Sequence, residues 1–349
     1  MAAKNTLHTF PLHVLGSGSI GLLYASALQG TVLLRRKHEP KLLRQEGKAS
    51  AFVRVNIFRD TASSMSEVKS QILPETIMDE SDNCSQPKND DGIQTILLCT
   101  KANDAIPALA GVLGRINEKS RIIILSNGGL AIRDEITKKL GARSPIIELA
   151  TTTNGAYLTN EFDPLGFSVV HAGIGSTYSS NADFIRAVRR ARIGGAVLLS
   201  NVDMNVMLWK KIAVNCVINP ITAMRGVKNG QLLEMIKSDS EIRHLVDEIL
   251  IEVSNVALAE INTDKLLAID EKALIGVNHE LSAPSLKDFV LKVATETQSN
   301  VSSMLQDIRN KRKTEVLYLN GYVAGLGKNI GSDCNANQAM CCRIEDMGG

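Results

Sequence analysis

Roughly the first 200 residues alternate between short apolar runs and longer segments with helical spacing. The runs are rich in β-branched residues and begin at His13, Thr31, Thr95, Arg121 and Phe167. Short strands separated by helix-length segments are typical of βαβ units. We therefore expect an α/β fold whose N-terminal domain, residues 1–199, is a Rossmann-type doubly wound sheet with mostly parallel strands.

The pattern changes near residue 200. From Trp209 to about Leu326, apolar residues recur at three- and four-residue spacing, which predicts packed helices. We expect an all-helical domain over 200–332 that carries the substrate-binding and catalytic residues. Residues 333–349 lack a clear periodic pattern and are expected to form a poorly ordered or loosely docked tail. Polar turn formers at 80–92 predict a solvated loop.

Composition excludes several classes of function. Lys+Arg 39 balance Asp+Glu 37, so no global field draws the chain to nucleic acid or to an anionic membrane. No window reaches the ~18 uninterrupted apolar residues of a membrane span, and the roughly ten residues before the first strand are too few for a signal peptide. The six cysteines lack paired CxxC spacing. We expect a cytoplasmic protein without a metal.

A glycine-rich hexapeptide follows the first apolar run. Gly16-Ser17-Gly18-Ser19-Ile20-Gly21 fits GxGxxG and opens a helical pattern. In such a motif the first glycine permits a tight turn, the second lets the backbone approach a pyrophosphate, and the third allows close packing of helix on strand. The helix N-terminus then offers N–H groups to phosphates. This context predicts a dinucleotide site, with a turn that binds no ligand as the alternative.

The end of the second apolar run favours one nicotinamide cofactor. An NAD site usually has a carboxylate there for the ribose 2′-hydroxyl, whereas an NADP site has arginine near the 2′-phosphate. The sequence reads Arg35-Arg36-Lys37 at this point. Three adjacent cations attract a phosphate and favour NADPH, although a solvated basic loop tip has the same composition.

Two further strand ends carry polar residues. The run from Thr95 ends in Cys-Thr-Lys101, and the run from Arg121 ends in Ser-Asn127-Gly-Gly. Ligands of open α/β sheets gather outside the carboxyl ends of the strands, so both residues are candidates for ligand binding. A surface lysine and an ordinary turn are the alternatives.

The clearest chemical signal is a polar stripe in an apolar helix. Lys211, Asn215 and Asn219 are four residues apart and are separated almost entirely by apolar residues. On a helix their side chains fall within ~80° of one another. An ammonium and two amides on a buried helix are costly unless partners satisfy them, and a polar substrate is one such partner. An internal asparagine network beside a snorkelling lysine is the structural alternative.

These segments together resemble the ketopantoate reductase family. The resemblance rests on GSGSIG, Cys-Thr-Lys101, Asn127-Gly-Gly, the WKKIAVNCVINPIT stretch, SSMLQD from residue 302, and TEVLYLNGY from residue 314. It extends from about residue 12 to about residue 330 with compatible order and spacing. Such enzymes reduce 2-dehydropantoate to pantoate with NADPH, on the way to pantothenate and coenzyme A.

The resemblance also implies roles for individual residues. Lys211 matches the catalytic lysine and Glu315 its partner carboxylate. Asn215, Asn219, Ser303 and Asn300 match substrate-binding positions, Lys101 and Asn127 match the cleft between cofactor and substrate, and Arg35 matches the 2′-phosphate arginine. Since negative charge develops on the keto oxygen during reduction, a protonated lysine held by a carboxylate would act as general acid.

Several points stay open at this level. The loop at 80–92 is longer than usual for the family, Asn335-Ala-Asn337 stands where Pro-x-Asn is usual, and no closing helix is evident. A non-catalytic NADPH-binding relative would be expected to lack Lys211 or Glu315. A reductase of another branched 2-keto acid would keep both, and a 6-phosphogluconate or hydroxyacyl dehydrogenase would have a different second domain. A homodimer is compatible with the helical second domain.

Overall fold

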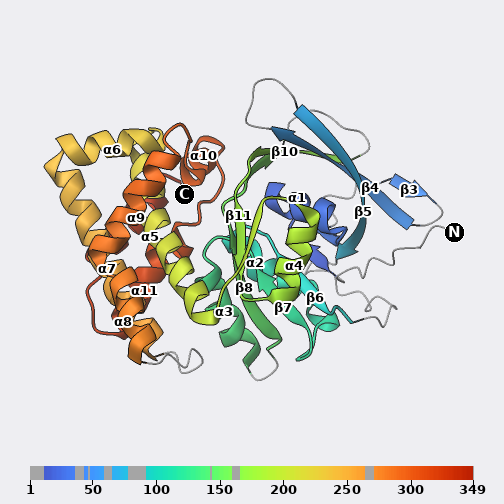
Figure 1. Ribbon diagram of the computed structural model, residues 1–349, viewed down its shortest axis with the longest axis horizontal. Helices are drawn as coiled ribbons and strands as arrows, with labels where there is room; N and C mark the ends of the chain where they lie inside the picture. The colour runs from blue at the N-terminus through green and yellow to red at the C-terminus, as the bar shows by residue number, and fades with distance from the viewer. Residues whose placement is uncertain are drawn as a thin grey trace. The chain divides into compact units, whose positions relative to one another are not determined.

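The computed structural model describes residues 12–35, 43–45, 48–58, 65–77, 92–141, 144–158, 166–263 and 271–348. The chain divides into two compact units, Met1–Leu199 and Ser200–Gly349 (Figure 1). The expected loop at 80–92 lies outside the described residues, except for Gly92.

The first unit contains one mixed sheet whose central strands are parallel. Side by side lie β8, β7, β6, β1, β2 and β5, all joined by parallel pairing. Their bounds are His13–Leu15 for β1, Thr31–Arg35 for β2, Met65–Ile77 for β5, Thr95–Leu98 for β6, Arg121–Ile124 for β7 and Ile146–Thr152 for β8. The predicted parallel core of the N-terminal domain is confirmed.

The outer strands extend this core and are partly antiparallel. On one side β11 pairs antiparallel with β8 and parallel with β12, and on the other side β4 pairs antiparallel with β5 and is followed by β10 and β9. The bounds are Leu43–Gln45 for β3, which pairs with β4, Lys48–Phe58 for β4, Gly155–Leu158 for β9, Gly166–Gly173 for β10, Ser176–Ser179 for β11 and Gly195–Leu198 for β12.

Helices cover both faces of the sheet, because the chain adds strands on both sides of its centre (Figure 1). From β1 the chain steps to β2 on one side, whereas from β6 it steps to β7 and β8 on the other. Because βαβ crossovers are right-handed, α1 (Ser19–Leu28) covers one face while α2 (Ala102–Ala110) and α3 (Gly129–Leu140) cover the other. The order in which the chain adds strands to the sheet thus reverses between β1 and β6. Open α/β sheets bind their ligands at such a point.

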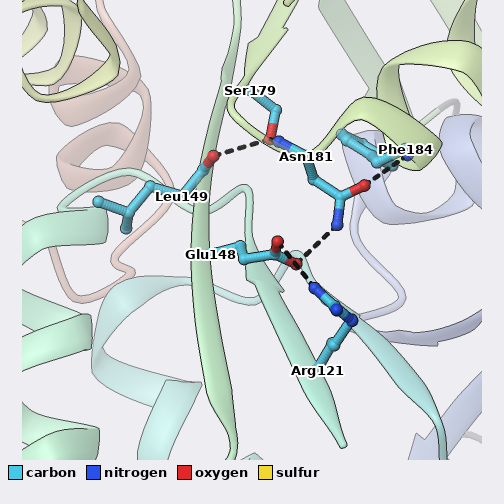
Figure 2. Close-up of polar contacts among 6 residues, drawn as sticks. All are labelled: Arg121, Glu148, Leu149, Ser179, Asn181 and Phe184. Atoms are coloured by element: carbon cyan, nitrogen blue, oxygen red, sulfur yellow. Dashed lines mark hydrogen bonds and ion pairs between the residues drawn. The ribbon is translucent and has the colours of Figure 1, made fainter. Parts of the chain in front are cut away.

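A chain of hydrogen bonds and one ion pair attaches α4 (Ala182–Ala191) to the sheet (Figure 2). The Asn181 side chain accepts a hydrogen bond from the Phe184 amide at 2.7 Å and so caps the helix. Its Nδ2 donates to Glu148 at 2.6 Å, and Glu148 also pairs with Arg121 at 3.0 Å. Neighbouring strands β7 and β8 therefore hold the start of α4.

The second unit is helical, as predicted. Its helices are α5 Asn201–Arg225, α6 Asn229–Ser238, α7 Ser240–Thr263, α8 Glu271–Glu280, α9 Ala283–Glu296, α10 Ser303–Arg309, α11 Asn320–Asn329 and α12 Asn335–Asp346. The long helix α5 contacts α6, α7, α9, α10 and α12. It begins where Ser200 accepts the Asp203 amide at 3.0 Å, and it ends at Gly226, whose φ of 67° suits glycine.

The end of the chain differs from the expected loose tail. Residues 335–346 form α12, which contacts α5, α7 and α11. Its buried residues recur at three- and four-residue spacing and are Ala336, Asn337, Met340, Cys341 and Ile344. A polar asparagine and a cysteine occupy core positions of this helix, and this composition hid its amphipathic pattern.

No helix in the described ranges is long and apolar enough to cross a membrane. Within the same ranges, no three His, Cys, Asp or Glu side chains gather in a way that could hold a metal ion.

Candidate active site

Two of the three glycines in the turn between β1 and α1 are required by space. Gly16 has a φ of +127°, and a Cβ there would lie 2.7 Å from the carbonyl carbon of Cys99 at the end of β6. A Cβ at Gly21 would lie 1.9 Å from the Gly16 oxygen. At Gly18, by contrast, a Cβ would meet no protein atom within 4 Å. The turn is thus tight on its protein side and open at Gly18.

The start of α1 has backbone donors that no side chain caps. Gly18 is the N-cap residue and makes no side-chain cap bond, so the first amides of the helix keep their partial positive charge. Ser19 points its hydroxyl elsewhere, donating to the Ala156 oxygen at 2.9 Å. Ile20 packs against the hydrophobic core, and Ser17 is half-buried. The open turn and the uncapped helix end fit a pyrophosphate held by backbone amides.

The ends of β6 and β7 lie beside this turn. Cys99 donates its amide to the Leu15 oxygen at 2.9 Å, which joins the ends of β6 and β1. Lys101 is the N-cap residue of α2, and Asn127 directly precedes the left-handed Gly128, the N-cap residue of α3. Both residues are half-buried. The structure thus brings Lys101 and Asn127 to the same edge of the sheet as the glycine turn.

Thr100, at the same edge of the sheet, has a buried polar group without a partner in the described part of the chain. Its carbonyl accepts a hydrogen bond from Ser126 at 2.7 Å. Its hydroxyl is buried and has no hydrogen-bond partner within the described part of the chain. A buried hydroxyl without a partner is costly, and a polar ligand beside the turn would satisfy it.

Arg35, the residue predicted to bind the 2′-phosphate, is described only in its backbone. β2 ends at Arg35, one strand away from the glycine turn, as a dinucleotide site requires. The Arg35 side chain, together with Arg36 and Lys37, lies outside the described residues.

In the second unit, the predicted polar stripe lies on α5. Lys211, Asn215 and Asn219 are in one continuous helix, and Nδ2 of Asn219 donates to Oδ1 of Asn215 at 3.4 Å. Asn219 is buried, whereas Lys211 and Asn215 are half-buried. The neighbouring Trp209 is buried and stacks on Tyr322 of α11 at 6.2 Å between ring centroids. The stripe is therefore part of a packed helix surface.

Glu315 and Lys211 act on each other electrostatically. Burial lowers the pKa of Lys211 to about 8, and the neighbouring Glu315 carboxylate opposes this shift by favouring the charged ammonium. The Glu315 side chain is buried, and the residue begins the 3-10 turn Val316–Tyr318 ahead of α11. A lysine with this pKa is mostly protonated at neutral pH.

Adjacent lysines on α5 have different surroundings. Lys210 pairs with Glu280 of α8 at 2.5 Å, and its ammonium lies 5.5 Å from the ring centroid of Phe289. Lys211 instead interacts with Glu315. Of the pair, only Lys211 is associated with a buried carboxylate, so Lys210 serves as a natural control.

The two serines at the start of α10 have different surroundings. Ser302 is buried, caps the helix and accepts a hydrogen bond from Thr222 of α5 at 2.8 Å. Ser303 is the first helical residue, and its side chain is exposed. Asn300 is also exposed, and its carbonyl accepts the Asn229 amide at 3.0 Å.

Two buried asparagines escaped the sequence reasoning. Asn229, at the start of α6, has a buried Oδ1 without a partner in the described part of the chain, while its Nδ2 donates to Thr297 at 3.0 Å. Asn320, at the start of α11, is fully buried. Each is followed by glycine, and this Asn-Gly signal indicates a turn as readily as a site.

Comparisons with known proteins cover both units. Residues 12–183 match a family model described as ketopantoate reductase PanE/ApbA, and residues 203–347 match one described as its C-terminal part. A 2-dehydropantoate 2-reductase from Vibrio cholerae is 30% identical over 254 residues, covering 72% of this chain and 77% of the relative.

Solved structures share the fold. A probable 2-dehydropantoate 2-reductase from Bacillus subtilis has a TM-score of 0.67 at 20% identity, over 97% of this chain and 99% of that one. D-mandelate dehydrogenase, solved with NADH and anilino(oxo)acetate, has a TM-score of 0.64 at 17% identity over 97% and 98%. A dimeric ketopantoate reductase from Staphylococcus aureus has a TM-score of 0.62 at 16% identity over 97% and 98%.

Proposed function

The chain belongs to the ketopantoate reductase family, and on that premise we propose that it reduces 2-dehydropantoate to pantoate with NADPH. One observation carries the proposal: the predicted lysine of α5 interacts with a buried carboxylate and has a pKa of about 8. That pairing has no evident purpose in a protein that only binds a dinucleotide, so the non-catalytic alternative is disfavoured.

In this proposal the first unit binds the cofactor. Amides at the start of α1 and the open backbone at Gly18 hold the pyrophosphate, and the unpartnered Thr100 hydroxyl gains a polar partner. Lys101 and Asn127 contribute a cation and an amide at the same sheet edge. NADPH, when bound, supplies the hydride that the keto carbon receives.

Lys211 supplies the proton. Negative charge develops on the keto oxygen as the carbon is reduced, and an ammonium in hydrogen-bond reach stabilises that charge and transfers a proton. Glu315 keeps Lys211 charged against the effect of burial. Because the protonated form is needed, the rate of reduction falls as pH rises through about 8.

Amides and a hydroxyl hold the substrate. Asn215 and Asn219 lie one and two turns further along α5, where their amides hydrogen-bond the hydroxyl and keto groups of a small polar acid. Ser303, whose side chain is exposed at the start of α10, and Asn300 donate to the substrate carboxylate.

The choice of NADPH over NADH rests on the basic sequence at the end of β2. Arg35 there would pair with the 2′-phosphate in bidentate fashion. D-mandelate dehydrogenase, of the same fold, was solved with NADH, so the fold alone does not select the cofactor. Steady-state rates with each cofactor, for the parent and for Arg35→Ala, test this point: the substitution should raise the KM for NADPH and leave that for NADH unchanged.

The central experiment compares two adjacent lysines. Purified parent, Lys211→Ala and Lys210→Ala are assayed for NADPH oxidation with 2-dehydropantoate and with other branched 2-keto acids. Lys211→Ala should lower kcat by about 10² to 10⁴, the usual contribution of a general acid, while Lys210→Ala stays near the parent. Equal rates for parent and Lys211→Ala would overturn the role of Lys211. A higher kcat/KM with another 2-keto acid would overturn the assignment of 2-dehydropantoate as the substrate.

We also propose a homodimer, as in the Staphylococcus aureus relative, and a cytoplasmic location. The described cysteines are free thiols, in keeping with a reducing compartment. Light scattering on the purified protein tests the dimer directly.

A further inference from the structure

Pro220 interrupts the hydrogen bonding of α5 beside the polar stripe. Proline has no amide hydrogen, so the carbonyl of Cys216, four residues earlier, loses its helical donor. Cys216 is fully buried, which makes an unsatisfied carbonyl there costly. Asn320 supplies the missing donor: its Nδ2 lies 3.0 Å from the Cys216 oxygen.

Asn320 is itself held by a buried chain of hydrogen bonds. Its Nδ2 also donates to Oδ1 of Asn337 on α12 at 3.0 Å. Nδ2 of Asn337 donates to Glu252 of α7 at 2.8 Å and to the Ile249 oxygen at 3.3 Å. The Glu252 carboxylate also accepts the Ala336 and Asn337 amides at 2.8 Å each, a favourable place for a negative charge at a helix start. Three helices thus fix the orientation of the Asn320 amide.

This hydrogen bond joins the two segments that carry Lys211 and Glu315. Cys216 is five residues beyond Lys211 (216 − 211 = 5), and Asn320 is five residues beyond Glu315 (320 − 315 = 5). Helix α5 connects Lys211 to Cys216, and the 3-10 turn Val316–Tyr318 lies between Glu315 and Asn320. A shift of Asn320 relative to α5 would therefore move the carboxylate relative to the ammonium.

We propose that Asn320 is a positioning residue for the Lys211–Glu315 pair: it replaces the helix hydrogen bond that Pro220 removes and so sets how closely the carboxylate approaches the ammonium. The role in catalysis rests on the proposed function, whereas the positioning itself does not. Asn337 and Glu252 support Asn320 from α12 and α7.

Removal of the Asn320 amide should affect the chemical step more than substrate binding. In Asn320→Ala, kcat should fall by roughly tenfold to a hundredfold, as small misplacements of catalytic groups do, with KM changed by less than about threefold. As Glu315 recedes, the pKa of Lys211 should fall further below its value of about 8. The exposed Asn329, at the other end of the same helix, gives the matched control Asn329→Ala, which should behave like the parent.

A double-mutant cycle with Pro220→Ala tests the cause. Alanine at 220 restores the amide donor to the Cys216 oxygen, so Asn320→Ala should cost at least about threefold less in kcat in this background than in the parent. Should Asn320→Ala fail to fold, Asn320→Ser replaces it in both backgrounds, because its hydroxyl keeps a polar group at this buried position but is too short to reach the carbonyl. Equal losses of kcat in the two backgrounds would refute the proposal.

The pKa of Lys211, followed by NMR of protein with ¹³C-labelled lysine, separates this proposal from the proposed function. A lower pKa in Asn320→Ala but not in Asn329→Ala supports positioning, even in a parent that proves inactive on 2-dehydropantoate. An unchanged pKa in Asn320→Ala refutes it, even in a parent that is fully active.

Discussion

The glycine turn of the first unit and the lysine helix of the second achieve their geometry in different ways. In the turn, contacts between residues close in sequence set the geometry: only glycine fits at position 21, because a Cβ there would overlap the Gly16 oxygen. In α5, partners distant in sequence set the geometry: Glu315 favours the charged form of Lys211 against the effect of burial, and the Cys216 carbonyl is satisfied by Asn320, 104 positions away in sequence.

This difference separates two kinds of functional motif. A motif limited by local space has a fixed sequence signature and is sensitive to the addition of single atoms. A motif completed by remote partners keeps its own residues but changes in pKa and geometry when a distant residue changes. Substitutions in the two regions should therefore fail in different ways.

The largest effect is expected at Gly21. In Gly21→Ala the added Cβ would lie 1.9 Å from a backbone oxygen, so the turn or α1 must move. We expect a loss of about 3 kcal/mol or more, a Tm lower by roughly 10 °C, and NADPH binding too weak to detect by fluorescence titration. Gly18→Ala is the matched control for stability, since its Cβ would meet no protein atom within 4 Å. A Tm for Gly21→Ala equal to that of Gly18→Ala would contradict the steric account.

A smaller effect, visible in the pH profile, is expected at Glu315. Glu315→Gln removes the charge that favours the lysine ammonium, so the pKa of Lys211 falls below about 8 and the protonated acid is lost at lower pH. The falling limb of kcat against pH should therefore move to lower pH, and the rate at neutral pH should fall by roughly ten- to a hundredfold. A limb that stays in place would mean that Glu315 does not control the protonation of Lys211.

The smallest effect is expected at Lys210. Its ion pair with Glu280 involves a carboxylate that is 51% exposed, so solvent screens much of the attraction. Lys210→Ala should cost less than about 1 kcal/mol of stability, measured by denaturant unfolding, and should leave kcat within about twofold of the parent. A large loss of kcat would show that the two adjacent lysines do not divide their tasks as their contacts suggest.

The contrast between local contacts and contacts with distant segments also explains how much could be predicted from the sequence. The βαβ core, the glycine turn and the polar stripe of α5 were predictable because each depends on local spacing. The antiparallel pairing of β4 with β5, the helix α12 and the hydrogen bond from Asn320 to α5 depend on contacts between distant segments. Asn337 illustrates the difficulty: a fully buried amide with several hydrogen bonds looks like a loop residue in the sequence.

Ser302 and Ser303 show the remaining limit. Both residues belong to the motif that suggested a substrate site, yet only the folded structure distinguishes the helix cap from the exposed hydroxyl. Two neighbouring serines have the same chemistry, and the fold alone determines which one faces a partner.

The bond from Asn320 to Cys216 also bears on how the chain matures. Ribosomes extend a protein from its N-terminus, and domains fold as units as they emerge. The first unit is contiguous in sequence and ends at Leu199, so the glycine turn can form while later residues are still being made. The lysine helix must wait, because its buried carbonyl receives a donor only after another 104 residues have been added. The glycine turn can therefore form well before Lys211 and Glu315 are held together.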